Sequence, residues 1–205
     1  MTFRRARSED CKKIRITEIL SAAESVIAEQ RFERCNLNDI AAAVGMSKPA
    51  LYRYFRVKEL IFLEIYRREL SELIPLLIKA FTPPSSEAIT KVFVSRPIFC
   101  RLSGILTTVL EQPLTLEEAI DFKSEVAILM QPLVKTVAIE LSLTPQNAIQ
   151  CILQLFSSLI GAWHLSNPSA LMAKAYEIPE LSVFNMKFYD SLYWHIEALL
   201  KGYVD

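Results

Sequence analysis

Glycine is the residue that most limits what this 205-residue chain can fold into, because it occurs only four times. A sheet protein of this length would need more glycine for its tight turns. The four positions, Gly45, Gly104, Gly161 and Gly202, lie far apart, so no two of them can form a phosphate-cradling loop. Leucine-rich apolar runs separated by prolines instead predict an all-α protein of helices joined by short loops.

Composition excludes several other classes of protein. With 52% hydrophobic residues, the chain can bury a core, and we do not expect disorder. The four cysteines contain no C-x-x-C pair and the two histidines stand alone, so no metal site, cofactor or redox motif is expected. The N-terminal residues lack the apolar stretch of a secretion signal, which favours a cytoplasmic protein with reduced thiols.

Apolar periodicity and proline positions predict the helices and the domains. We expect helices over residues 10–30, 36–45, 48–54, 58–80, 86–94, 97–111, 115–141, 145–166, 168–175 and 183–201. The clearest linker is the run from Thr82 to Ser86, which contains two prolines. We predict an N-terminal domain over residues 1–57 and a larger helical domain over 58–205, which begins with the long helix 58–80.

No charged residue occurs from Leu141 to Ala173, a length that could span a bilayer. Glutamine, asparagine and serine interrupt the run, whereas a spanning helix needs about 18 or more nearly continuous apolar residues. We therefore expect no membrane segment, and an uncharged helix over 145–166 that other helices or another subunit must cover.

Two short helices joined by a tight turn are predicted between residues 36 and 54. Asn36 can cap the first of them, with Asp39 in the position of a capping-box acid. Gly45 lies where the chain reverses and a positive φ is needed. Ser47 can cap the second helix, and Pro49 falls in its first turn, where a missing N–H costs little. This is the pattern of a helix-turn-helix, whose second helix enters a DNA major groove.

The charge of the same block agrees with binding to nucleic acid. Residues 40–58 carry four cations and no acid, and Tyr52 and Tyr54 add hydroxyl groups that can donate to phosphate. Residues 1–58 hold 12 basic and 7 acidic groups, so the zero net charge of the chain conceals a basic N-terminal end. The alternative is a solvated basic turn on a helical enzyme. That enzyme would need a catalytic constellation, which the sequence does not offer, and we predict that the protein is not an enzyme.

With these features in view, residues 19–60 resemble a TetR-family transcriptional regulator. The matching residues are Ile19, Ala22, Ala23, Phe32, Leu37, Ile40, Ala41, Gly45, Met46, Ser47, Lys48, Leu51, Tyr52, Arg53, Tyr54, Phe55, Lys58, Glu59 and Leu60. Two positions depart from the family pattern: Arg31 stands where the family usually has glycine, and Cys35 replaces a common threonine.

The resemblance implies a three-helix DNA-binding domain, a larger helical effector domain, a homodimer, and repression relieved by a small molecule. It places Asn36 at the cap of the second helix, and Tyr54 and Lys58 at phosphate-contacting positions. Base contacts near Pro49 and Ala50 would be apolar, which leaves base hydrogen bonds to Lys48 and to Asn38 or Arg53. The predicted DNA-contacting residues are Asn36, Asn38, Ser47, Lys48, Pro49, Ala50, Tyr52, Arg53, Tyr54 and Lys58.

The second half is expected to dimerise and to bind an effector. The resemblance favours a dimer built from helix 145–166 and the final helix, which would place two recognition helices on an inverted-repeat DNA operator; burial within one subunit is the alternative. The effector is predicted to be a small apolar or aromatic molecule, oriented by His164 or Gln154. Its candidate contacts, each of which could instead be plain core, are Phe99, Leu106, Phe122, Met130, Phe156, Trp163 and His164.

Some alternatives stay open at this point. The basic cluster Arg4, Arg5, Arg7, Lys12, Lys13 and Arg15 could contact DNA or be a frayed, solvated terminus. Cys100 and Cys151 could form a thiol sensor, but without basic neighbours they fit buried small hydrophobes better. A helical protein with a thiol- or lipid-responsive sensing role is the remaining alternative function.

Overall fold

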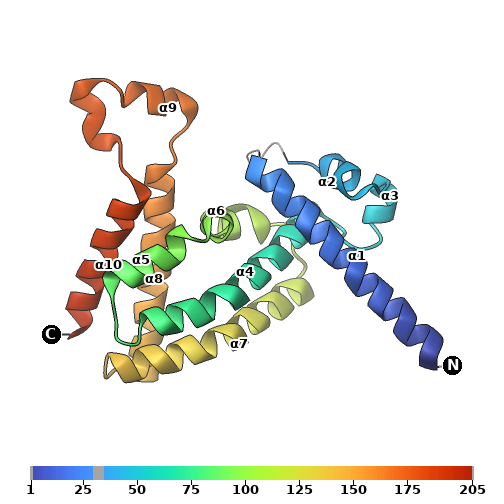
Figure 1. The fold of residues 1–205 in the computed structure, drawn as a ribbon, viewed down its shortest axis with the longest axis horizontal. Helices are drawn as coiled ribbons and strands as arrows, with labels where there is room; N and C mark the ends of the chain where they lie inside the picture. Colours follow the sequence, from blue (N-terminus) through green and yellow to red (C-terminus); the bar gives the residue numbers. More distant parts are fainter. Residues whose placement is uncertain (1, 30–34, 205) are drawn as a thin grey trace. The chain divides into compact units, whose positions relative to one another are not determined.

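The computed structural model describes residues 2–29 and 35–204, and the side chains of residues 11–27 and 35–203. Within these ranges the chain folds entirely into helices (Figure 1), as the glycine content predicts, with no β-strand. The elements are α1 (Thr2–Glu29), α2 (Leu37–Val44), α3 (Lys48–Leu51), α4 (Lys58–Ala80), α5 (Ser86–Val94), α6 (Pro97–Ile105), the π-helix η2 (Leu106–Leu110), α7 (Leu116–Glu140), α8 (Pro145–Ser166), α9 (Ala170–Ala175), the 3₁₀-helix η3 (Pro179–Phe184) and α10 (Phe188–Val204).

Several expected boundaries need correction. The first helix begins at Thr2 and not at residue 10, so the N-terminal basic cluster is helical. The last helix begins at Phe188 and not at residue 183, because Pro179 starts a separate 3₁₀-helix that ends at Phe184. The prediction of one α-helix over residues 97–111 is wrong, because α6 ends at Ile105 and Leu106–Leu110 forms a π-helix. Gln30, Arg31 and Phe32 lie outside the described residues.

The chain divides into two compact units. Unit 1 comprises residues 1–68 and 106–119, and unit 2 comprises residues 69–105 and 120–205. The division falls inside α4 and inside the first turn of α7, so two helices are shared between the units. The boundary predicted at residue 57 stays a prediction, since the compact units follow contacts and not chain order.

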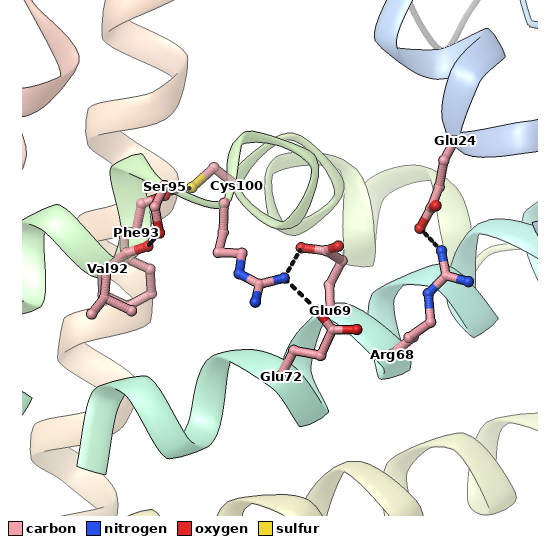
Figure 2. A network of polar contacts seen from close by, with 9 residues as sticks. Glu24, Arg68, Glu69, Glu72, Val92, Phe93, Ser95 and Cys100 are labelled. Atoms are coloured by element: carbon pink, nitrogen blue, oxygen red, sulfur yellow. Dashed lines mark hydrogen bonds and ion pairs between the residues drawn. The ribbon is translucent and has the colours of Figure 1, made fainter. Parts of the chain in front are cut away.

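Unit 1 has a core formed by α1, α2, α3 and the start of α4. The apolar side of α1 is fully buried at Ile19, Ala23 and Ile27. Arg68 on α4 forms an ion pair with Glu24 on α1 (Figure 2), which ties these two helices together. In unit 1 the two short helices, α2 and α3, therefore pack with the longer helices α1 and α4.

In unit 2, α8 contacts α6 and α10, and α5 contacts α6 and α10 (Figure 1). An aromatic cluster forms its centre: the rings of Phe93, Phe99 and Phe156 lie 5.9 to 6.4 Å apart. Beside this cluster the Cys100 thiol donates to the Phe93 carbonyl at 3.2 Å (Figure 2). The guanidinium of Arg96 pairs with Glu72 at 2.6 Å and with Glu69 at 3.7 Å, which fixes α4 to the α5–α6 corner.

Among the described residues, one helix, α8, is long and apolar enough by length and composition to cross a membrane. Helix α5 and the segment 97–110 would pass the same test only if counted as a single span, and they are bent by 84°. The core helix of a globular domain meets the same criteria. In α8, 33% of the apolar window is buried inside the protein, including Cys151, Leu155 and Leu159. Helices α6 and α10 pack against α8, whereas Leu153 and Leu165 on α8 are exposed.

Candidate nucleic-acid interface

The start of α2 is held by a capping box, as the sequence predicts. The Asn36 side-chain oxygen accepts from the backbone N–H groups of Asn38 at 2.8 Å and Asp39 at 3.2 Å. The Asp39 carboxylate in turn accepts from the Asn36 N–H at 3.3 Å. These bonds satisfy N–H groups that a helix start leaves without partners, and they fix where α2 begins.

The end of α2 is a Schellman turn centred on Gly45. Its φ is 68°, in the left-handed region that glycine enters most easily. The Met46 N–H donates to the Ala41 carbonyl at 2.8 Å, and the Gly45 N–H to the Ala42 carbonyl at 3.1 Å. The turn predicted at Gly45 is therefore confirmed, and it sets the angle at which α3 leaves α2.

Helix α3 is shorter than expected and ends at Leu51, not at Tyr54. Ser47 caps it by accepting from the Ala50 N–H at 3.4 Å, and Pro49 lies in the first turn as predicted. Past Leu51 the backbone tightens, with the Tyr54 N–H donating to the Leu51 carbonyl three residues earlier at 2.9 Å. Such i→i−3 bonds are common where a helix ends.

Buried side chains hold this motif from behind. Ile40 and Leu51 are fully buried, and Ala41 and Phe55 are nearly so. Ala41 on α2 has a small side chain, which allows helices to approach closely at this position. Because these anchors point inward, the opposite side of the motif faces solvent.

The ten predicted DNA-contacting residues are distributed over that solvent-facing side. Tyr52 is 47% exposed although it is a large aromatic residue. Three of the residues are half-buried, Ala50, Tyr54 and Lys58. The exposed or largely exposed ones are Asn36, Asn38, Ser47, Lys48, Pro49, Tyr52 and Arg53.

Two of the four cations in the basic block are engaged inside unit 1, which sequence reasoning missed. The Lys58 ammonium donates to the Cys35 carbonyl at 2.8 Å, one residue before the cap of α2. Arg56 donates to the Pro113 carbonyl at 2.9 Å and to the Glu118 carboxylate at 2.7 Å. The Arg56 guanidinium and the Thr115 N–H lower the pKa of Glu118. The exposed positive charge therefore rests mainly on Lys48 and Arg53.

Family comparisons agree with this geometry over nearly the whole chain. Residues 19–65 match the model described as bacterial regulatory proteins, tetR family, and residues 79–205 match the tetracyclin repressor-like, C-terminal domain. The chain belongs to the TetR family. No match was found among curated proteins. As a TetR-family protein it is a DNA-binding transcriptional regulator, and its helix-turn-helix is the DNA-binding element.

The seven predicted effector contacts stay predictions, and the structure shows what several of them pack against. Phe99 and Phe156 belong to the aromatic core of unit 2, and Phe122 is buried. Trp163 packs edge-on against Phe188 at 5.3 Å between ring centroids, whereas Leu106 belongs to unit 1. The two predicted orienting groups are both bonded: His164 Nε2 to the Gly104 carbonyl at 3.0 Å and Gln154 to the Tyr203 hydroxyl at 3.1 Å.

Unit 2 also has an apolar groove between α7 and α8 with a volume of about 730 Å³. Of the seven predicted contacts, Met130 is the one that lines it. Its polar lining groups are Gln131 and Lys135, both on α7. Its apolar lining is Ala127, Met130, Val134, Ala138, Ile139, Pro145, Ile149, Ile152 and Leu153.

The thiols of unit 2, Cys100 and Cys151, are buried, as expected for small hydrophobic residues. Burial raises the pKa of Cys100 to about 12 and that of Cys151 to about 11. At neutral pH both stay protonated, and the thiolate is the reactive form of cysteine. They therefore behave as small core residues.

Proposed function

We propose that this protein is a repressor that binds an inverted-repeat operator as a homodimer and is released by a small apolar or aromatic molecule in the cytoplasm. The observation that carries the proposal is the solvent-facing side of α3, presented by a Schellman turn and backed by buried Leu51. A recognition helix needs this combination of a rigid base and an uncovered reading face.

Base reading is assigned to the start of α3. Lys48 is exposed at its first position and can donate to the acceptors of guanine in the major groove. Pro49 is exposed and offers an apolar surface that suits a thymine methyl group. Asn38 on α2 or Arg53 past α3, both exposed, would supply a further polar contact to a base.

Phosphate contacts are assigned to residues at the edges of the motif. The Tyr54 hydroxyl can donate to a phosphate oxygen, and Asn36 lies at the start of α2, where helix N–H groups favour anions. The Lys58 ammonium has three donors, so it can bind the Cys35 carbonyl and a phosphate oxygen together. Lys58 would thus contact both the DNA backbone and the residue that precedes the α2 cap.

Dimerisation is supported by uncovered apolar surface in unit 2. On α8, Leu165 is 55% exposed. Beyond α8, the segment containing α9 and η3 extends away from α8 and α10 (Figure 1), with Leu171 and Val183 more than three-quarters exposed. Exposed apolar side chains of this size favour protein–protein contact, and a two-fold dimer implies an inverted-repeat operator.

The groove between α7 and α8 is our candidate effector site. A volume of about 730 Å³ with an apolar lining falls in the range of small-molecule sites. A panel of lipophilic and aromatic compounds can be screened by thermal shift and for release of bound DNA. Ala138→Trp, which fills the groove from α7, should remove the response to any compound that acts there, whereas a compound still active on this variant binds elsewhere.

The DNA-binding proposal is tested by selecting duplexes from a random library and measuring affinity against salt concentration. We expect an enriched inverted repeat whose half-site centres lie one helical turn or a small multiple apart. Lys48→Ala should relax the base preference, and Tyr54→Phe should weaken binding to all sequences. Lys79→Ala removes an equal charge from an exposed position on unit 2 and serves as the control.

An enriched single half-site would contradict the dimer, and a library without enrichment would contradict sequence-specific binding. Equal effects of Lys48→Ala and Tyr54→Phe on all duplexes would show that the division into reading and positioning residues is wrong.

A further inference from the structure

A basic hollow in unit 1 adds two residues of α1, Lys12 and Arg15, to Arg53 and Tyr54, for which DNA contacts are proposed above. It has a volume of about 480 Å³ and lies between α1 and the turn that follows α3. Lys12 and Arg15 line it from α1, and Arg53 and Tyr54 line it from the turn, with Cys11 at its edge. None of these five lining residues is acidic, so the hollow brings three cations together from two distant segments.

The chemistry of the hollow suits a phosphate group. Guanidinium groups bind phosphate with paired N–H donors, and the Tyr54 hydroxyl adds a neutral donor. Arg15 also pairs with Glu18 at 2.6 Å, which offsets part of the positive charge. Lys12 and Arg53 are exposed, so an incoming anion reaches them without displacing a buried contact.

The position of the hollow indicates which phosphate would bind there. Arg53 lies two residues past the end of α3, the helix to which we assign base reading. We infer that the hollow binds a backbone phosphate of the DNA beside the base pairs read by α3, so that α1 is part of the DNA-binding surface. The inference rests on the proposed function, and it assigns Lys12 and Arg15 a role that the helix-turn-helix pattern does not include.

The reactivity of Cys11, which lines the hollow, can report whether the hollow is occupied. Cys11 is exposed, whereas Cys35, Cys100 and Cys151 are buried. Burial also raises the pKa of all three buried thiols, which keeps them in the unreactive protonated form. A neutral alkylating reagent such as N-ethylmaleimide should therefore modify Cys11 first in the folded protein.

The first experiment measures the rate of Cys11 alkylation in the full chain, alone, with the duplex selected from the library, and with inorganic phosphate. If a DNA phosphate fills the hollow, the duplex at ten times its dissociation constant should slow alkylation about tenfold. Unchanged alkylation on saturated DNA would overturn the inference. Protection by inorganic phosphate but not by the duplex would assign the hollow to a free anion and would also overturn it.

The second experiment compares Lys12→Ala and Arg15→Ala with Lys13→Ala, a neighbour that is exposed on α1 but does not line the hollow. Removing a side chain that binds one phosphate should reduce the slope of log affinity against log salt by about 1. We expect this reduction for Lys12→Ala and Arg15→Ala and a smaller one for Lys13→Ala. Equal slopes for all three variants would overturn the inference.

The two experiments separate this inference from the proposed function. If the wild-type protein shows no salt-sensitive binding to any selected duplex, the proposed function fails and the inference fails with it. If the wild-type protein binds but Cys11 stays freely reactive and the slopes match, the inference alone fails.

Discussion

Arg56, in the turn after α3, donates to the carboxylate of Glu118 at 2.7 Å across 62 residues of sequence. Glu118 lies in the first turn of α7, where its carboxylate also accepts from the Thr115 N–H at 2.8 Å and forms a capping box. The same carboxylate thus starts α7 and holds the turn that follows the recognition helix.

The first prediction concerns the energy of this pair. Arg56→Ala and Glu118→Ala should each destabilise the protein, and the double variant should lose less than the sum. Because the two side chains are 50% and 28% exposed, we expect a coupling of about 0.5 kcal/mol. Urea unfolding of the four proteins measures it. Glu117→Ala in the same turn is the control, and strictly additive losses would contradict the coupling.

The second prediction is a pH dependence. The Arg56 bond lowers the pKa of Glu118 below its ordinary value of 4.5, so the folded state binds this proton less readily than the unfolded state. The contribution of Glu118 to stability is therefore complete above that value and is lost as pH falls through the lowered pKa. Glu118→Gln keeps a capping side chain. Its stability deficit should be constant near neutrality and shrink in acid; a deficit that grows in acid would contradict the lowered pKa.

The third prediction concerns the turn between α2 and α3. A Cβ at Gly45 would meet no atom within 4 Å, so the cost of Gly45→Ala comes from its φ of 68° alone. We expect a loss of about 1 kcal/mol and weaker DNA binding. Gly202→Ala is the matched control, since its Cβ also meets nothing and its φ is not positive. Thermal unfolding of both variants should separate the cost of backbone strain from the cost of fitting an added Cβ. Equal melting temperatures would show that the turn is not strained.

The fourth prediction concerns close packing between α6 and α8. A Cβ at Gly104 would lie 3.2 Å from His164 Nε2 and 3.2 Å from Trp163 Cδ1, so Gly104→Ala should cost about 1–3 kcal/mol by overpacking. Adding His164→Ala removes one of the two obstructing rings. The double variant should therefore lose less than the two single losses combined, as measured by urea unfolding. Simple additivity would show that Gly104 does not press on His164.

Local interactions explain why so much of the DNA-binding motif was predictable. The capping box at Asn36, the left-handed turn at Gly45 and the cap at Ser47 each involve atoms within a few residues of one another. Residue type and spacing therefore specify them almost completely. The length of α3 was overestimated because tightening of its last turn depends on how Leu51 and Phe55 are buried, which periodicity does not show.

The effector contacts were harder to predict for a physical reason. Aromatic residues at helical spacing pack a core and line a cavity with the same sequence pattern. That Phe99 and Phe156 pack together while Met130 lines the groove follows only from the placement of the helices in space. Glu118 lies near the start of the helix predicted over residues 115–141. Nothing near Glu118 in the chain indicates that it pairs with Arg56.

The amino-acid sequence was sufficient for the all-helical class, the helix-turn-helix and the basic N-terminal end, because these follow from glycine content, capping and charge along short stretches. Tertiary structure alone paired Arg56 with Glu118 and Lys58 with the Cys35 carbonyl, opened the groove between α7 and α8, and brought Arg53 beside Lys12. These contacts join segments distant in the chain, and their partners are chosen by how the helices pack and not by the spacing of residues along any one of them.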